Sequence, residues 1–267
     1  MTPAKERKEF VVNEIIENVY QLQDKFQACA SLIIGNKKAV LFDTMNGVGN
    51  LKGLVEEITS LPLQVINSHG HVDHIGGNYQ FGKVFMNNKD RSVIETNRAI
   101  LETIETNMHQ ELINCKKSME MSDQMFDIEP GTIIDLGERT LRVVPLEGHT
   151  QGSIGLLLEE ERILFAGDAF TPQMCLFFPE SLSVEEYQNM IIRTMEEPFD
   201  QYVLGHYTQL FPKSYLLKML ECSKLVQQNA RSYYYEYSLV PEYKGRLYIY
   251  DMNDSLIQDM ICMIVKS

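Results

Sequence analysis

The stretch His69-Gly70-His71-Val72-Asp73-His74 places three imidazoles and one carboxylate within six residues. The short apolar run Leu63–Ile66 precedes it and is typical of a strand, while Gly76 and Gly77 follow it. Apolar residues do not alternate through the six positions, so the stretch lacks the pattern of a core face. Burying four such groups without partners would be costly, so the stretch favours a functional site over a structural role.

Composition and charge restrict the classes of partner. The chain has 267 residues, of which 44% are hydrophobic, enough for a large core in one domain or two closely packed ones. Its 24 Lys and Arg against 37 Asp and Glu give a net charge of -13, which disfavours nucleic acid and anionic membrane surfaces as partners. No apolar run approaches the ~20 residues of a membrane span. We therefore expect a small-molecule substrate, no nucleic acid and no membrane.

The cysteines and the N-terminus predict a cytoplasmic protein. The number of cysteines is odd and they are widely spaced without a C-x-x-C pair: Cys29, Cys115, Cys175, Cys222 and Cys262. This pattern is typical of reduced thiols rather than of a disulfide framework. Residues 1–9 are charged and lack the apolar segment of a signal peptide, so none is expected.

Periodicity predicts two similar blocks of strands and helices, which we treat as layers of one domain, 1–267. The first block has expected strands in 10–22, 28–34, 39–42, 63–66 and 84–86 and a helix over 51–60. The second has strands in 132–136, 141–145, 153–158, 162–166 and 199–204 and helices over 183–195 and 212–230. A helical insertion of one or two helices is expected at about 89–125. A C-terminal extension is expected at about 212–267, with a strand over 246–250 and a strand or helix over 255–265.

Histidines and aspartates recur directly after the predicted strands. Five of the six histidines do so, namely His69, His71, His74, His149 and His206, as do Asp43, Asp73 and Asp168. The irregular separations between them are typical of a metal site assembled from several strand ends. Imidazole and carboxylate ligands suit Zn, and also Fe or Mn. His109 lies in a charged helical stretch and is expected to be a solvated surface residue.

Five segments, in order, resemble the motifs of the metallo-β-lactamase superfamily. His69 to His74 match its H-x-H-x-D-H motif, which is the most specific of the five. The other four segments are Leu41-Phe42-Asp43-Thr44, Glu147-Gly148-His149-Thr150-Gln151-Gly152-Ser153, Phe165-Ala166-Gly167-Asp168 and Leu204-Gly205-His206. The resemblance implies an α/β fold, a four-layer αββα sandwich with two metal ions at one edge. Its ligand set is similar to that of the glyoxalase II and lactonase members.

Carried over position by position, the resemblance implies a role for each matching residue. The first metal would be bound by His69, His71 and His149, and the second by Asp73, His74 and His206. Asp168 would bridge both ions and Asp43 would orient a ligand. The implied cofactor is a pair of divalent ions, with Zn favoured over Fe or Mn.

The resemblance implies a metal-dependent hydrolase. A bridging hydroxide would attack an ester, thioester, lactone or phosphodiester, and Asp73 would take its proton. The bridging position is Asp168 rather than the Cys of zinc β-lactamases, which disfavours antibiotic hydrolysis. Two alternatives stay open: an iron-binding redox protein with the same ligands, and a metal-binding sensor without turnover.

Substrate contacts are harder to predict. Cys175 and Phe177 lie in an apolar run that could line a pocket or pack in the core, and Tyr207 follows a predicted ligand and could donate to an oxyanion. The run Tyr233-Tyr234-Tyr235 leaves core, pocket wall and dimer face open, so a homodimer is compatible with the sequence.

Overall fold

Two large sheets form the centre of the computed structural model, which describes residues 5–7, 9–103, 110–238 and 240–266. The first sheet has the order β1-β2-β3-β4-β5-β6-β7-β8 and the second the order β15-β14-β12-β11-β10-β9. The strands of the first sheet are β1 (Lys5–Arg7), β2 (Phe10–Ile16), β3 (Val19–Asp24), β4 (Cys29–Ile34), β5 (Ala39–Phe42), β6 (Leu63–Ile66), β7 (Val84–Met86) and β8 (Met125–Asp127). Those of the second are β9 (Ile133–Asp135), β10 (Thr140–Pro145), β11 (Ile154–Leu158), β12 (Ile163–Phe165), β14 (Gln201–Val203) and β15 (Phe211–Pro212).

The central strands are apolar on both faces because both faces are covered. In β4, Leu32 packs toward α1 (Leu51–Ile58), whereas the next residue, Ile33, packs between the two sheets. In β11, Leu156 faces the first sheet and Leu157 faces the layer that contains α5 (Val184–Thr194) and α6 (Leu216–Gln227). The layers are therefore helix, sheet, sheet, helix, which confirms the predicted αββα sandwich.

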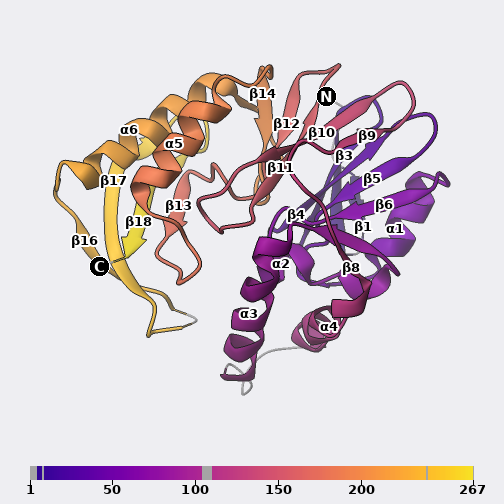
Figure 1. Ribbon diagram of the computed structural model, residues 1–267, viewed down its shortest axis with the longest axis horizontal. Helices are drawn as coiled ribbons and strands as arrows, with labels where there is room; N and C mark the ends of the chain where they lie inside the picture. Colours follow the sequence, from indigo (N-terminus) through magenta and orange to yellow (C-terminus); the bar gives the residue numbers. More distant parts are fainter. Residues whose placement is uncertain (1–4, 8, 104–109, 239, 267) are drawn as a thin grey trace.

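A third sheet extends the fold beside α5 and α6 (Figure 1). Its order is β13-β18-β17-β16, with β13 (Gln173–Leu176), β16 (Tyr233–Glu236), β17 (Lys244–Asp254) and β18 (Asp259–Lys266). Residues of β13, β17 and β18 pack in the same core cluster as β12, β14, α5 and α6. This shared core supports treating the chain as one domain, which stays a prediction.

β8, β13 and β16 are among the strands that the sequence did not predict. β8 begins where the helical insertion was expected to end, β13 lies in the apolar run that contains Cys175, and β16 contains the run Tyr233-Tyr234-Tyr235. Each is three or four residues long and is defined by its partner strand rather than by its own periodicity. The segment 255–265, left open between strand and helix, is mostly strand β18.

The insertion at 89–125 contains two helices, α3 (Arg91–Thr103) and α4 (Gln110–Met119). They form a small core with the short helix α2 (Val72–Ile75), and Figure 1 shows α3 continuing away from α2. Within the described residues, no helix is long and apolar enough to cross a membrane.

Candidate metal centre

The loop after β6 presents the first four predicted ligands. β5, β6 and β7 run parallel, so the loops after them leave the first sheet at the same edge. His69 lies in the loop after β6, and His71 is the residue before the four-residue helix α2. Asp73 and His74 lie in that helix, so one tight loop-to-helix turn holds all four side chains near one another.

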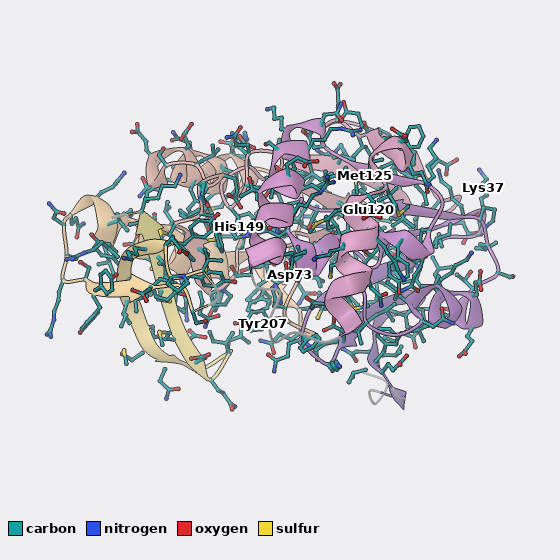
Figure 2. All side chains as sticks on the ribbon, turned by 90° about the horizontal axis from the view of Figure 1, so that it is seen from below. Lys37, Asp73, Glu120, Met125, His149 and Tyr207 are labelled. Atoms are coloured by element: carbon teal, nitrogen blue, oxygen red, sulfur yellow. The ribbon has the colours of Figure 1, made fainter. Side chains whose placement is uncertain are left out.

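The second sheet supplies the remaining three ligands. His149 follows β10, Asp168 follows β12 and His206 follows β14, and β12 and β14 are parallel neighbours. A Cβ atom on Gly205 would lie 2.6 Å from Asp168 Oδ1 and 2.6 Å from His74 Cε1. Glycine is therefore required at this position, because any side chain would intrude between the two halves of the site. In Figure 2 the labelled Asp73 and His149 lie in the middle of the molecule.

Three buried imidazoles converge in the first group of ligands, His69, His71 and His149. His71 Nδ1 lies 3.1 Å from His69 Nε2 and 2.9 Å from His149 Nε2. The structure thus brings together the residues that sequence comparison assigns to the first ion.

The hydrogen bonds on the far side of each ring assign the tautomers of these three residues. His149 Nδ1 donates to the carbonyl of Cys175 at 2.8 Å, and His71 Nε2 donates to Glu180 Oε1 at 2.7 Å. His69 Nδ1 lies 2.9 Å from Ser68 Oγ, whose own hydrogen is donated to Asp43 Oδ2. Each far nitrogen therefore carries the hydrogen, and three lone pairs point at one another. Such an arrangement repels itself unless a cation lies between the nitrogens.

Burial keeps two imidazoles of the first group, those of His69 and His149, neutral. Desolvation, together with the nearby imidazole of His71, lowers the pKa of His149 to about 4 against the opposing charge of Asp168. Desolvation also lowers the pKa of His69 well below its usual value, with the same direction from His74 and His71. Neutral imidazole is the form that binds a metal ion.

The second group combines carboxylates with imidazoles: Asp73, His74 and His206, with Asp168 beside them. His206 Nε2 lies 3.3 Å from Asp73 Oδ2 and 3.2 Å from Asp168 Oδ2. Asp168 Oδ1 lies 3.5 Å from His74 Nε2, and its Oδ2 lies 4.0 Å from His149 Nε2 of the first group. The carboxylate of Asp168 therefore lies between the two groups, as expected for a bridging ligand.

Opposite charges shift the pKa values in the second group. Burial alone would lower the pKa of His74 and His206, but the neighbouring carboxylates, with Asp168 the largest influence, raise both well above the usual value. The same contacts hold the pKa of Asp73 and Asp168 below the usual range, although burial alone would raise it. Without a metal ion, this group balances its charges internally.

Asp43 orients ligands of both groups. Its Oδ2 lies 2.9 Å from His74 Nδ1 and accepts from Ser68 Oγ at 2.8 Å, while its Oδ1 accepts from Ser68 N at 2.7 Å. Ser68 in turn contacts His69. Asp43 therefore lies behind the predicted ligands rather than among them, and its role in orienting them stays a prediction.

Asp90 was missed by sequence reasoning. This fully buried carboxylate accepts from Gly70 N at 2.8 Å, from Gly152 N at 2.6 Å and from Thr150 Oγ1 at 2.7 Å. It thereby joins the loop of His71 to the loop of His149. Its place shortly after β7, as Asp43 follows β5, was a signal that could have found it.

The residues predicted to contact substrate have other partners. The Tyr207 hydroxyl donates to Gln173 Oε1 at 2.7 Å, and Phe177 is buried against aromatic residues, including Tyr235. Cys175 contributes its carbonyl to His149, while burial raises the pKa of its thiol. Phe178 is the aromatic residue in contact with the first group, with its ring centroid 5.1 Å from that of His71. His109 lies outside the described residues.

The donor set fits divalent metal ions. In each of three groups, the ligand atoms lie within 4.8 Å of one another, and His69, His74 and Asp168 form the group between the other two. His74 Nε2 and Asp168 Oδ1 are buried and make no hydrogen bond within the described part of the chain. Buried polar atoms are normally satisfied, and a cation bound between these two atoms would satisfy both. Within the described residues, no cysteine belongs to any of the three groups.

Comparison with known proteins agrees with this geometry. The model of the metallo-beta-lactamase superfamily matches residues 24–206. The chain is 25% identical over 177 residues to the acyl-coenzyme A thioesterase MBLAC2 of Homo sapiens, covering 57% of this chain and 63% of that protein. It is 28% identical over 156 residues to the hydroxyacylglutathione hydrolase GloC of Haemophilus influenzae, covering 53% of this chain and 66% of that protein.

Solved structures agree at the level of the fold. The metallo-beta-lactamase from Pontibacter korlensis superimposes with a TM-score of 0.61 at 17% identity, covering 81% of this chain and 99% of that one. The chain spans less than two thirds of the length of MBLAC2, so that relative does not by itself assign an activity. The family match covers more than half of the chain and includes all seven predicted ligands. The chain therefore belongs to the metallo-beta-lactamase superfamily.

Proposed function

We propose that the protein is a metal-dependent hydrolase of acyl thioesters. The observation that supports this most strongly is the convergence of two ligand groups on Asp168, with three imidazole lone pairs directed at one point in the first group. The chemistry of the donors suits two zinc ions, with iron or manganese as the alternatives.

Each ligand has a proposed place. The first ion would be held by His69, His71 and His149 and the second by Asp73, His74 and His206, with Asp168 shared. A pair of ions supplies two things when bound: it makes a water molecule acidic enough to attack near neutral pH, and it polarises the carbonyl of the substrate. Asp43 keeps the ring of His74 in the tautomer that exposes Nε2.

Asp73 is the proposed acceptor of a proton from the attacking water. Its side chain is one-third exposed, at 33%, and its pKa lies below the usual range, so it is a carboxylate at neutral pH. A carboxylate of low basicity accepts only a proton that has already been made acidic. Asp73 is thus suited to this step only together with bound ions.

The substrate class is inferred from the relatives. One is named an acyl-coenzyme A thioesterase and another a hydroxyacylglutathione hydrolase, and both names describe cleavage of a thioester. Phe178 and its neighbour Tyr237, whose ring centroids lie 5.6 Å apart, would contact the acyl part of the substrate. We propose no cysteine nucleophile, because burial raises the pKa of the Cys175 thiol. A cytoplasmic location and a homodimer stay predictions.

Metal analysis and a substrate panel test the proposal together. The purified protein should contain about two equivalents of metal. It should hydrolyse S-acyl coenzyme A or S-acyl glutathione faster than a p-nitrophenyl ester, a lactone or a phosphodiester. His71→Ala should lose activity while keeping the circular dichroism spectrum of the fold. Two tightly bound ions without turnover on the panel would instead favour a sensor, and an iron-specific spectrum with redox activity would favour a redox protein.

A further inference from the structure

Glu180 contacts the metal centre from a segment that matches no predicted motif. It lies between β13 and α5, and its Oε1 lies 2.7 Å from His71 Nε2. Both side chains are buried, with 9% of Glu180 and 11% of His71 exposed. Glu180 Oε2 makes no hydrogen bond among the described residues. The carboxylate is therefore held at the site through His71.

This contact fixes which nitrogen of His71 faces the other ligands. A carboxylate only accepts hydrogen bonds, so His71 Nε2 must carry a hydrogen, and in the neutral ring, the form that binds a metal ion, the lone pair is on Nδ1. Nδ1 is the atom that lies near both His69 and His149. His69 and His149 are oriented by a hydroxyl and a carbonyl, so His71 is the ligand of the first group that is held by a carboxylate.

The C-terminal strand holds the segment that carries Glu180. Lys266 Nζ donates to the carbonyls of Pro179 at 3.1 Å and Ser181 at 2.8 Å, one on each side of Glu180. Lys266 reaches them because β18 pairs in parallel with β13, with Val265 opposite Leu176. Ser181 Oγ also donates to the carbonyl of His149 at 2.9 Å. The segment is thus attached to the C-terminal sheet on one side and to a ligand loop on the other.

We propose that Glu180 is a positioning residue for His71, and that Lys266 extends this support to the C-terminal sheet. The matched family region ends at residue 206. Lys266 lies beyond that region, so a residue outside it would support the first metal site. The inference rests on the proposed metal centre, since it concerns how tightly the first ion is bound.

Titration of the metal-free protein with zinc and with cobalt(II) tests the role of Glu180. Glu180→Ala should weaken binding of the first ion by about 10- to 100-fold, as is typical when the partner of a ligating histidine is removed. The cobalt absorption of that ion should change and the second ion should bind as before. Glu180→Gln should lose less, because the amide oxygen still accepts from His71 Nε2. Glu185→Ala, an exposed position on α5, should match the wild type.

A double-mutant cycle tests the role of Lys266. Lys266→Met should weaken binding of the first ion, but by less than Glu180→Ala does. It should have no further effect on that binding when Glu180 is already alanine. Lys266→Arg keeps a donor and should retain most of the affinity, and Lys244→Met in the same sheet is the control. Thermal unfolding of each metal-free variant shows that the fold is kept.

The proposal would be overturned if Glu180→Ala bound the first ion with wild-type affinity and wild-type cobalt absorption. It would also be overturned if this variant lost affinity equally for both ions. Additive effects of the Lys266 and Glu180 substitutions would overturn the part that concerns the C-terminal sheet. Failure of the proposed function is distinguishable, because these titrations use no substrate. A wild-type protein that binds two ions but cleaves no thioester fails the proposed function alone.

Discussion

The two ligand groups lie side by side, but the pKa values of their imidazoles are shifted in opposite directions. In the first group, burial lowers the pKa of His69 and of His149. The second group pairs His74 and His206 with carboxylates that raise the pKa of both imidazoles. His69 and His149 are thus neutral and have lone pairs ready, whereas the imidazoles of the second group hold protons that an ion must displace. The carboxylate of Asp168 lies near imidazoles of both groups.

The two groups are expected to bind their ions in a fixed order. An ion in the first group relieves the repulsion between lone pairs directed at one point, and His69 and His149 carry no proton there for it to displace. An ion in the second group replaces favourable contacts between charged side chains. We therefore expect the first group to fill before the second.

The largest expected effect is that of breaking the link between the groups. Asp168→Ala removes the carboxylate that lies near His74, His206 and His149. Thioester hydrolysis should fall by more than the ~100-fold that is typical for residues that only orient ligands. Steady-state kinetics measures the loss, and Asp200→Ala, an exposed aspartate, is the control. Activity within tenfold of the wild type would show that the groups act without this bridge.

Removing one ligand from each group should separate the two sites. His71→Ala should leave a protein that binds one ion in the second group, and His206→Ala one that binds an ion in the first group. The reason is that, in each variant, the mutated group has lost one of its ligands while the other group keeps all of them. Metal content after dialysis against trace zinc checks the prediction. Loss of both ions in both variants would mean that the two groups form one cooperative site.

Acidity should weaken the second ion more than the first. At pH 7 the imidazole of His149, with a pKa of about 4, is neutral, whereas His74 and His206 carry raised pKa values and are protonated without metal. Each proton that an ion displaces weakens its binding by about tenfold per unit fall in pH. Calorimetric titration in buffers of different ionisation enthalpy counts the released protons. Equal release from both steps would contradict the assigned difference.

The smallest of these effects is expected for Asp43→Asn. The amide keeps the size of the side chain but weakens its contacts with His74 and Ser68. Both ions should bind about tenfold more weakly, because His74 belongs to one group and Ser68 orients His69 of the other. Zinc titration with a competing chelator measures the two affinities. A change at one ion only would confine the role of Asp43 to that group.

The ligands could be predicted from the sequence because each directly follows a strand or lies in a short motif. His69 to His74 are consecutive, and Asp168 and His206 each follow a short apolar strand. The αββα layers were implied by the resemblance of the five segments to the metallo-β-lactamase superfamily, whereas periodicity predicted the individual strands and helices. Local sequence therefore defines the parts of the site that come from parallel strand ends.

The supporting residues could not be predicted because their partners are distant in the sequence. Glu180 and His71 are separated by 109 positions, and Lys266 and Ser181 by 85. Neither residue differs in its local pattern from a solvated surface charge. The short strands β13 and β16 were missed for a related reason, since their pairing with β18 and β17 defines them. Contacts between residues far apart in the sequence thus determine the supporting residues and the short strands, which the local sequence pattern does not indicate.

The central claim is that two ions, one in each ligand group, are needed to cleave a thioester. The most direct measurement follows thioester hydrolysis while the metal-free protein is titrated with zinc. We expect no hydrolysis without metal, little at one equivalent, where the first group is filled, and full activity at two equivalents. Full activity in the metal-free protein, or a maximum at one equivalent, would contradict the account.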